Sequence, residues 1–429
     1  MSKFNDSWNE VFQRYPILEG IDNDGYFDIT ADELKTIREP RLMVKQDHRR
    51  DRPDVFARNG LNILPLNRGS YRIARMELFH NFEADWDNAS DNVIVVPPSD
   101  VESIDFNHIT SEAIAIKSIF CTNILQDFVE DDRLRDTVSG RMGSGMFQFS
   151  VDGLIGHPRN QIQVENAQIE IDAGYEGQNA LYLLEAKCNL AQDFLVRQLY
   201  YPFRCWEQKV HKTVCPIFFI YSNGIYHLME YAFDNPSSYN SIHCVKYKKY
   251  RIAEEERITE ETLVEISRTV HPVAEPNVPF PQADSFERVM NLCEEMALRG
   301  MSMTKEDIWH FFSFTDRQSD YYGNAGIYLG LLERDGRSCF RLSPVGLELF
   351  CGNLSHVQRH KRIVALILAH GVLNDCFQVR LHAGQDLETA QYEAIMRRHT
   401  ECNLTEQLYG RRSGTVKHWI HWIFNLANN

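Results

Sequence analysis

Three features are missing from this sequence, and each absence excludes a class of protein. None of the 10 cysteines belongs to a Cys-x-x-Cys pair, so the spacing of a zinc finger is absent. No apolar run reaches the length of a membrane span, and the opening residues, MSKFNDSWNE, lack the apolar stretch of a signal peptide. An excess of positive charge is also missing, because the net charge is −15. We therefore expect a cytoplasmic protein with reduced thiols, no contact with membranes, and at most a local surface for nucleic acid.

One segment reverses the overall charge. Residues 35–75 hold eleven Lys or Arg and four Asp or Glu, a local net charge of +7. Such a segment is either a solvated basic face without a ligand or a surface that contacts phosphates, where each cation displaces counterions. In the second case, the sequence predicts DNA contacts from Arg41, Lys45, Arg49, Arg50 and Arg52.

The same region carries the signals of a small folded module. Thr30 and Glu33 form a capping-box pattern at the start of a helix. The stretch LNILPLNRGSYRIARM alternates like two strands around a Gly-Ser turn. A helical unit followed by a β-ribbon is typical of a winged-helix module, so we predict a DNA-binding module of this kind over residues 1–104.

The middle of the chain predicts a mixed α/β layer over residues 105–270. Apolar positions recur at helical spacing over 108–132, and a turn leads into a strand in RMGSGMFQFSVDG. A hairpin follows over 169–187, then a helix over 189–208 and a second hairpin around Asn223-Gly224. Residues 271–283, HPVAEPNVPFPQA, contain four prolines and read as a linker to a helical C-terminal domain, 284–429.

The first hairpin, IEIDAGYEGQNALYLLEAK, ends a strand of core character with Glu-Ala-Lys. Side chains alternate along a strand, so Glu185 and Lys187 share one face. A turn near Gln178 brings Asp172 within about one residue of the position opposite Glu185. Two carboxylates in this position repel each other, and a hard cation such as Mg²⁺ would relieve the repulsion. Lys187 would then orient or deprotonate the attacking water, with its pKa lowered by burial. The alternative is an ordinary surface salt bridge.

Helix, strand, acid-bearing hairpin ending in Glu-x-Lys, helix and strand is the order of the PD-(D/E)XK nuclease core. Residues 105–250 resemble a family of bacterial type II restriction endonucleases of this superfamily. The resemblance is carried by the stretches GRMGSGMFQF, IEIDAGYEG, LLEAK and RQLYYPFRCWEQKVHKTVCPIFFIYSN. The resemblance implies Mg²⁺-dependent cleavage of double-stranded DNA at a short site, in a bacterial cytoplasm. It makes Asp172 and Glu185 the metal ligands and Lys187 the catalytic lysine. One departure is that Ile171, not proline, precedes the first acid.

Four further residues are candidates for the same site. Gln198 stands before Tyr201, one residue short of the Gln-x-x-x-Tyr of some relatives, and the resemblance makes it a catalytic candidate. Glu112 is either a further acid of the site or an exposed acid favoured by the dipole of the helix that it begins. Arg141 and Ser144, in the stretch GRMGSG, either approach a phosphate backbone or belong to a plain turn.

The C-terminal domain carries the order helix, turn, helix, wing of a winged helix-turn-helix. Thr304 would cap the first helix, and a hairpin at Asp335-Gly336 would form the wing. Recognition helices read bases with their N-terminal residues, so DNA contacts are predicted for Arg317, Gln318, Ser319 and Tyr322. Thr405 would cap a later helix, and a further one would open with Arg411 and Arg412, also predicted to contact DNA. A winged helix serves protein contacts equally well.

The sequence and its resemblance together predict an α/β multi-domain protein. Its central PD-(D/E)XK core would be a mixed sheet flanked by helices, and it would lie between N-terminal and C-terminal winged-helix-like DNA-binding domains. Besides a restriction endonuclease, a DNA repair or methylation-dependent nuclease and a DNA-binding regulator on an inactive nuclease scaffold stay open. The intact set of Asp172, Glu185 and Lys187 favours an active enzyme. One such set per chain suggests a homodimer on double-stranded DNA, since a duplex break needs two sites or two sequential nicks.

Overall fold

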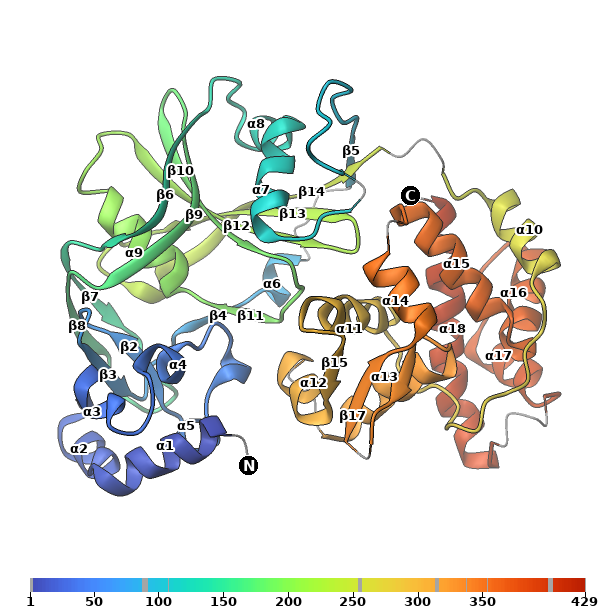
Figure 1. Ribbon diagram of the computed structural model, residues 1–429, viewed down its shortest axis with the longest axis horizontal. Helices are drawn as coiled ribbons and strands as arrows, with labels where there is room; N and C mark the ends of the chain where they lie inside the picture. Colours follow the sequence, from blue (N-terminus) through green and yellow to red (C-terminus); the bar gives the residue numbers. More distant parts are fainter. Residues whose placement is uncertain are drawn as a thin grey trace. The chain divides into compact units, whose positions relative to one another are not determined.

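The computed structural model describes residues 3–86, 92–106, 108–253, 257–312, 316–336, 338–352, 354–399 and 404–428. The chain divides into two compact units (Figure 1). We call them the N-terminal unit (Met1–Val93, Ser111–Tyr221 and Tyr226–Tyr250) and the C-terminal unit (Ile94–Thr110, Ser222–Ile225 and Arg251–Asn429). The prediction of a multi-domain protein with a mixed sheet and helices is confirmed.

The first part of the N-terminal unit is a small module of helices on an antiparallel sheet, with the strand order β1 (Tyr26–Thr30), β3 (Ser70–Ala74), β2 (Asn62–Pro65). The predicted capping box is present, because the hydroxyl of Thr30 accepts from the N–H of Glu33 at 3.2 Å, and the carboxylate of Glu33 accepts in return at 2.7 Å. Trp8 and Phe56 are fully buried at its centre. The module's helices are α1 (Lys3–Arg14), α2 (Ile17–Asp24), α3 (Ala31–Lys35), α4 (Pro40–Val44), the 3-10 helix η1 (Arg49–Asp51) and α5 (Asp54–Asn59).

A seven-stranded mixed sheet follows, in the order β5 (Asn92–Val95), β14 (Ile242–Ile252), β13 (Ile225–Phe233), β12 (Thr213–Ser222), β10 (Ala180–Lys187), β9 (Gln168–Glu176), β6 (Arg135–Gly143). Strands β9 and β10 form the predicted antiparallel hairpin, whereas β10 and β12 run parallel. Strand β10 is buried along almost its whole length, which explains its continuous apolar sequence. The second predicted hairpin, at Asn223-Gly224, is also present between β12 and β13.

Short elements surround the sheet, and two predicted helices differ from expectation. The helix predicted over 108–132 is broken into α7 (Glu112–Cys121) and α8 (Ile124–Val129), because Asn123 adopts a left-handed conformation with φ 58°. The helix predicted over 189–208 is helical only as α9 (Arg197–Trp206), since the residues before it form strand β11 (Asp193–Leu195), paired with β4 (Phe79–Asn81). The remaining elements are α6 (Glu83–Trp86), the paired strands β7 (Met146–Val151) and β8 (Asn160–Glu165), and η2 (Tyr239–Ser241).

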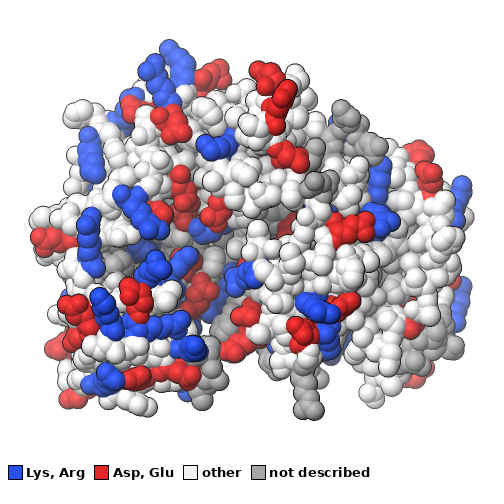
Figure 2. All heavy atoms as spheres, viewed as in Figure 1, with Lys and Arg blue, Asp and Glu red and all other residues white. Residues whose placement is uncertain are grey.

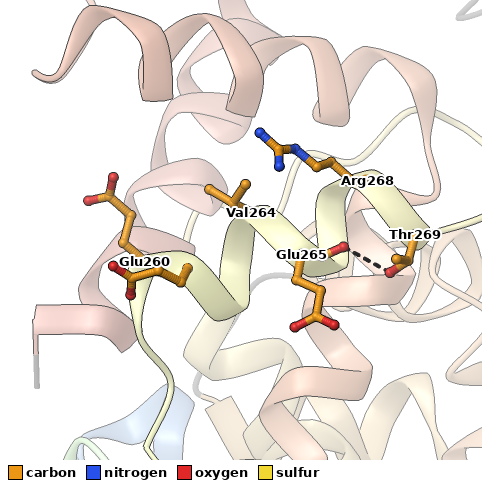
Figure 3. A pocket seen from close by; sticks show the side chains of 6 residues that line it. Glu260, Val264, Glu265, Arg268 and Thr269 are labelled. Carbon is orange, nitrogen blue, oxygen red and sulfur yellow. Dashed lines mark hydrogen bonds between the residues drawn. The ribbon is translucent and has the colours of Figure 1, made fainter.

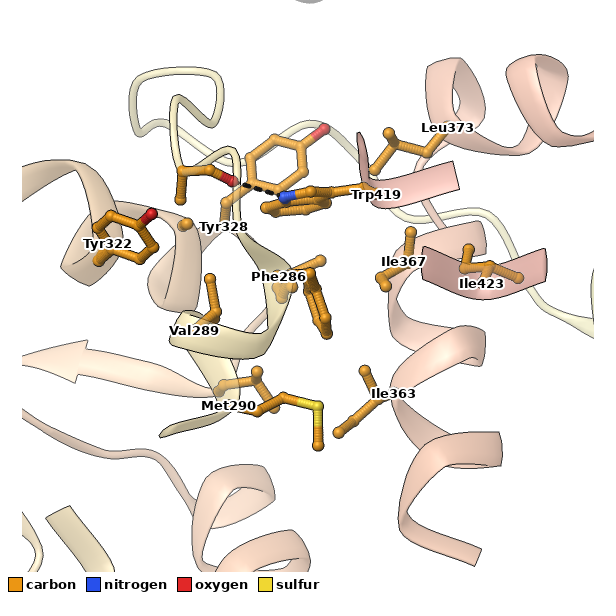
Figure 4. Close-up of a cluster of buried hydrophobic side chains, with 14 of the residues drawn as sticks. Phe286, Val289, Met290, Tyr322, Tyr328, Ile363, Ile367, Leu373, Trp419 and Ile423 are labelled. Atoms are coloured by element: carbon orange, nitrogen blue, oxygen red, sulfur yellow. Dashed lines mark hydrogen bonds between the residues drawn. The ribbon is translucent and has the colours of Figure 1, made fainter. Parts of the chain in front are cut away.

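The C-terminal unit is mainly helical, with a three-stranded sheet in the order β15 (Ser302–Thr304), β17 (Cys339–Leu342), β16 (Leu332–Arg334). Figure 4 shows its core, where Phe286 lies against Trp419 with ring centroids 5.1 Å apart. The indole N–H of Trp419 donates to the carbonyl of Ala283 at 2.7 Å. The helices are α10 (Glu260–Thr269), α11 (Phe286–Leu298), α12 (Lys305–Phe312), α13 (Asp316–Tyr328), α14 (Pro344–Cys351), α15 (His356–Leu368), α16 (Gly371–Ala383), α17 (Thr389–Met396) and α18 (Glu406–Asn428).

Two expectations for this unit change. The end of the chain is one continuous helix, α18, where the sequence predicted a second helix opening at Arg411. Gly410 and Gly414 do not interrupt it, because its buried apolar face outweighs their cost of about 1 kcal/mol each. Helix α10, within the residues assigned from sequence to the central domain, belongs to the C-terminal unit and contacts α15 and α18. Among the described residues, no single helix is long and apolar enough to cross a membrane. Of the described helices, only the pair of α15 and α16, which is bent at the break between the two helices, has the length and composition of a membrane span.

Candidate active site

The hairpin of β9 and β10 brings two carboxylates together where its pairing ends. The last paired residues are Leu184 and Ala173, and continuing this register places Asp172 opposite Glu185. Beyond this point, a side-chain hydrogen bond takes the place of the backbone hydrogen bonds between the strands, because Oδ2 of Asp172 accepts the N–H of Ala186 at 2.8 Å. The expected juxtaposition of the two acids is therefore found, at a place where the strands begin to separate.

Glu185 is the most buried acid of this group, with 8% of its surface exposed. Its Oε1 accepts hydrogen bonds from Nζ of Lys187 and, at 2.6 Å, from Nε2 of Gln198. Burial raises the pKa of Glu185 to about 7, the charge of Lys187 opposes this shift, and the charge of Asp172 adds to it. The carboxylate thus carries a negative charge that its surroundings only partly stabilise.

Lys187 is charged in this arrangement. Burial lowers its pKa, but the carboxylates of Glu185 and Glu112 raise it, and the net shift is upward. The lowered pKa was expected for a lysine beside a metal ion; without one, the charges of Glu185, Glu112 and Asp47 and the hydrogen bond to Glu185 together outweigh desolvation. Lys187 is therefore placed to orient a ligand or to stabilise negative charge.

Gln198 completes the group from the first turn of α9. Its Oε1 is buried without a hydrogen-bond partner among the residues that the structure describes. Beside it lies a cavity of about 10 Å³, which Gln198 and Glu185 line together with residues of β9, β10 and α9. A space of this size holds about one water molecule. The orphan oxygen of Gln198 is therefore placed to accept a hydrogen bond from a bound water.

Glu112 begins α7, where Ser111 caps the helix. Burial raises the pKa of Glu112, the charge of Lys187 lowers it, and the charge of Asp172 raises it. These influences place its carboxyl group within electrostatic range of the two hairpin residues. Glu112 is exposed, as the second of its two sequence interpretations expects, and the influence of Lys187 and Asp172 agrees with the first, so both interpretations stay open.

A magnesium ion fits this donor set in one respect and not in another. Among the described residues, no group of three or more His, Cys, Asp or Glu could hold a metal ion. Magnesium, however, commonly takes one or two protein carboxylates and completes its shell with water and substrate phosphate. Burial is the main cause of the raised pKa of Glu185 and the charge of Asp172 adds to it, and a cation would relieve the repulsion between the two carboxylates. The two acids therefore fit a Mg²⁺ ion that relies on substrate for the rest of its coordination.

The basic residues predicted to contact DNA in the N-terminal module fall into two groups. Arg41 and Lys45 are exposed. The guanidinium of Arg49 instead pairs with Glu77 at 2.7 Å and with Asp193 at 3.5 Å. The side chain of Arg50 is buried, and Arg52 donates to the carbonyl of Arg49 at 2.9 Å. These last three cations are engaged within the protein, so Arg41 and Lys45 are the better placed for phosphates.

The two residues of the Gly-rich stretch are also placed differently from each other. Arg141 lies within β6, not before the first strand of the sheet, and pairs with Glu170 at 3.1 Å on the surface. Ser144 is buried in the turn after β6, where its N–H donates to Ala167 and its hydroxyl to Gly145. Ser144 therefore serves the turn, and Arg141 keeps an exposed guanidinium.

In the C-terminal unit, α13 begins where the recognition helix was predicted. Gln318 is exposed, Ser319 and Tyr322 are buried, and the side chain of Arg317 lies outside the part that the structure describes. On α18, Arg411 is exposed, whereas Arg412 is buried. Of these residues, the exposed ones remain candidates for DNA contact, and burial removes the others from direct readout.

Within the described part of the chain, neither the charge on the face drawn in Figure 2 nor the pocket on α10 defines a second site. On the face drawn in Figure 2, Lys and Arg side chains are intermingled with Asp and Glu side chains. A pocket of about 360 Å³ lies on α10 (Figure 3) and is lined by Glu260, Glu261, Val264, Glu265, Arg268 and Thr269. Its three glutamates make it unsuited to a nucleic-acid phosphate.

The residues of the candidate site were largely predicted from sequence, with one omission. Asp172, Glu185, Lys187 and Gln198 were predicted and lie together. Asp47 was not predicted, yet its charge raises the pKa of Glu185, after the larger effect of burial. Asp47 belongs to the basic segment, and no pattern in that segment links it to a hairpin more than 100 residues away.

Comparison with known proteins gives three family matches, each described as a domain of unknown function. The first (DUF6996) covers residues 5–73, the second (DUF6997) residues 74–251, and the third (DUF7226) residues 288–428. No curated protein and no solved structure matches the chain. Asp172, Glu185, Lys187 and Gln198 lie in the second match, and Asp47 in the first.

Proposed function

We propose that this chain is a Mg²⁺-dependent endonuclease that hydrolyses phosphodiester bonds in double-stranded DNA at a short specific sequence, as type II restriction endonucleases do. The observation that carries the proposal is the meeting of Asp172, Glu185, Lys187 and Gln198 at the end of the β9–β10 hairpin. Two carboxylates can hold a catalytic metal ion, and a charged lysine and an amide with an unpartnered oxygen can act beside it on the phosphate and the attacking water.

The finer fold assignments belong to the same proposal. The mixed sheet with α7 and α9 is proposed as a PD-(D/E)XK core. The module of residues 3–74 and the segment from α11 to β17 are proposed as winged-helix-like DNA-binding domains. Support comes from the order α11, β15, α12, α13, β16, β17 and from Thr304, whose hydroxyl accepts the N–H of Asp307 at 3.0 Å ahead of α12. With one site per chain, we also propose a homodimer on DNA.

The residues of the site divide the chemistry among them. Asp172 and Glu185 would hold a Mg²⁺ ion, which when bound supplies charge stabilisation at the phosphate and lowers the pKa of its water. Lys187 keeps Glu185 in place and offers a positive charge at the edge of the site. Gln198 fixes the same carboxylate, and its unpartnered oxygen can orient a water molecule.

Digestion of plasmid DNA tests the proposal. We expect the full-length protein to cut unmethylated plasmid into discrete fragments with MgCl₂ and to leave it intact with EDTA. Sequencing of the fragment ends would define the site and the cut position. Cutting only of methylated or damaged plasmid would assign the chain to the repair or methylation-dependent nucleases. Absence of cutting on every substrate would contradict the proposed activity.

A DNA-binding regulator on an inactive nuclease scaffold is the second candidate. The observation that favours it is that Oε1 of Glu185 already accepts hydrogen bonds from both Lys187 and Gln198. Such an ion pair can stabilise the fold without taking part in catalysis. Sequence-specific binding without cleavage in Mg²⁺ would favour this candidate over the enzyme.

Base readout is expected from the start of α13. Replacing Arg317 and Gln318 with alanine should lower the ratio of specific to non-specific DNA affinity about tenfold or more, since each bidentate base contact contributes about 1–3 kcal/mol of discrimination. Competition binding in Ca²⁺ measures the ratio. Arg362→Ala is a matched control, because Arg362 is exposed on α15 and pairs only with Glu348 among the described residues. An unchanged ratio in the double variant would place readout elsewhere.

A further inference from the structure

A segment of the N-terminal module, residues 45–49, lies against the elements that carry the candidate site. The N–H of Leu195 donates to the carbonyl of Asp47 at 2.9 Å. Asp193 holds the next two residues, because its Oδ1 accepts the N–H of Arg49 at 3.2 Å and its carbonyl lies 2.5 Å from Nδ1 of His48. Strand β11 ends at Leu195, and α9 begins two residues later. Backbone and side-chain contacts therefore fix the segment beside the helix that supplies Gln198.

The charges of this segment act on the charged groups of the site. Burial is the largest influence on the pKa values of Glu112, Glu185 and Lys187, but the charge of Asp47 acts on all three. The charge of Lys45 acts on Glu112. Nζ of Lys45 lies 3.3 Å from Oδ2 of Asp47, so the two side chains form an ion pair. The segment thus adds one cation and one acid to the edge of the site.

Lys45 is the more accessible of the two lysines. Its side chain is 75% exposed, whereas that of Lys187 is 14% exposed and binds Glu185 and the carbonyl of Ala186. A phosphodiester that enters the site meets several negative charges, namely Asp47, Glu112, Asp172 and Glu185. Repulsion by these groups has to be offset for the substrate to bind, and an exposed ammonium can do so without breaking the Lys187 pair.

We propose that Lys45 binds a phosphate of the DNA backbone next to the bond that is cut, and that Asp47 positions it. The N-terminal module then completes an active site that is built on the central sheet. This inference rests on the proposed function. Lys45 is assigned as a substrate-binding residue, since an ammonium contacts phosphate as a point charge. Asp47 is a positioning residue that acts through Lys45.

The test uses full-length protein and a duplex containing the cleaved sequence. DNA affinity is measured in CaCl₂ over a range of salt concentrations, and single-turnover cleavage in MgCl₂. Lys45→Ala should lower the slope of log affinity against log salt by about 0.9, the value of one phosphate contact. It should also slow cleavage about ten- to a hundredfold, as expected when a charged hydrogen bond is lost. Lys45→Arg should keep the wild-type slope. Asp47→Asn should also keep the wild-type slope but should slow cleavage.

Lys3→Ala provides the control, because Lys3 is an exposed lysine of the same module on α1. Equal losses for Lys3→Ala and Lys45→Ala would overturn the inference, since surface charge in general would explain them. Unchanged slope and rate for Lys45→Ala, with an active wild-type protein, would overturn it and leave the proposed function standing. A wild-type protein that neither binds nor cuts any DNA would overturn both the inference about Lys45 and the proposed function. Circular dichroism of each variant establishes that it is folded.

Discussion

Glu185→Gln is expected to slow Mg²⁺-dependent DNA cleavage about a thousandfold or more, while DNA binding in Ca²⁺-free buffer stays near that of the wild type. The amide keeps the size of the side chain and one oxygen for Lys187 or Gln198, so local packing is preserved. It removes the negative charge that would hold a cation. Asp172→Asn should act in the same direction, because both carboxylates are needed as oxygen donors. Single-turnover cleavage measures both variants.

Glu176→Gln is the matched control for this prediction. Glu176 lies on the same hairpin and also pairs with a lysine, Lys212, at 2.7 Å, but 40% of its side chain is exposed. Exposed ion pairs contribute little to stability, so this variant should cleave at the wild-type rate. A wild-type rate for Glu185→Gln would remove Glu185 from the reaction. A large loss in both variants would point to the hairpin's stability and not to its chemistry.

The parts of the site that sequence predicted are those that local geometry determines. A short turn joins the strands that carry Asp172 and Glu185, so strand alternation and hairpin register suffice to place the two acids opposite each other. Lys187 follows from the same alternation, and Gln198 lies on the next helix. The capping box at Thr30 and the turn at Asn223-Gly224 are equally local, and both were predicted.

The parts that sequence did not predict depend on tertiary contacts. Asp47 reaches the site because the backbone of residues 47–49 binds β11, and β11 itself exists because it pairs with β4. Strand β11 lies within the stretch that the sequence predicted as a helix, and its pairing with the distant strand β4 makes it extended. Composition likewise marks Arg49 as basic but does not tell that Glu77, 28 residues along the chain, neutralises it.

Acid should unfold this protein well before its carboxylates are all protonated, because both units bury histidines. Burial lowers the pKa of His227 to about 3, with a smaller contribution from Lys249, and its Nδ1 lies 2.6 Å from the hydroxyl of Tyr247. Burial also lowers the pKa of His356 to about 3, and Arg251 adds to this shift. A lowered pKa means that the unfolded chain binds the proton more tightly. Stability is therefore complete above about pH 6.5 and falls as the pH drops toward 3.

We expect the free energy of unfolding to fall by about 2 kcal/mol per buried histidine between pH 8 and pH 5, since 1.5 pH units below the unfolded pKa correspond to about that amount. Urea unfolding at the two pH values measures the change. In His227→Gln, an amide can replace the hydrogen bond to Tyr247, and the acid-induced loss should shrink by about 2 kcal/mol. His418→Gln, an exposed residue of α18, should leave the loss unchanged. A loss of the same size in His227→Gln and wild type would mean that His227 does not cause the acid sensitivity.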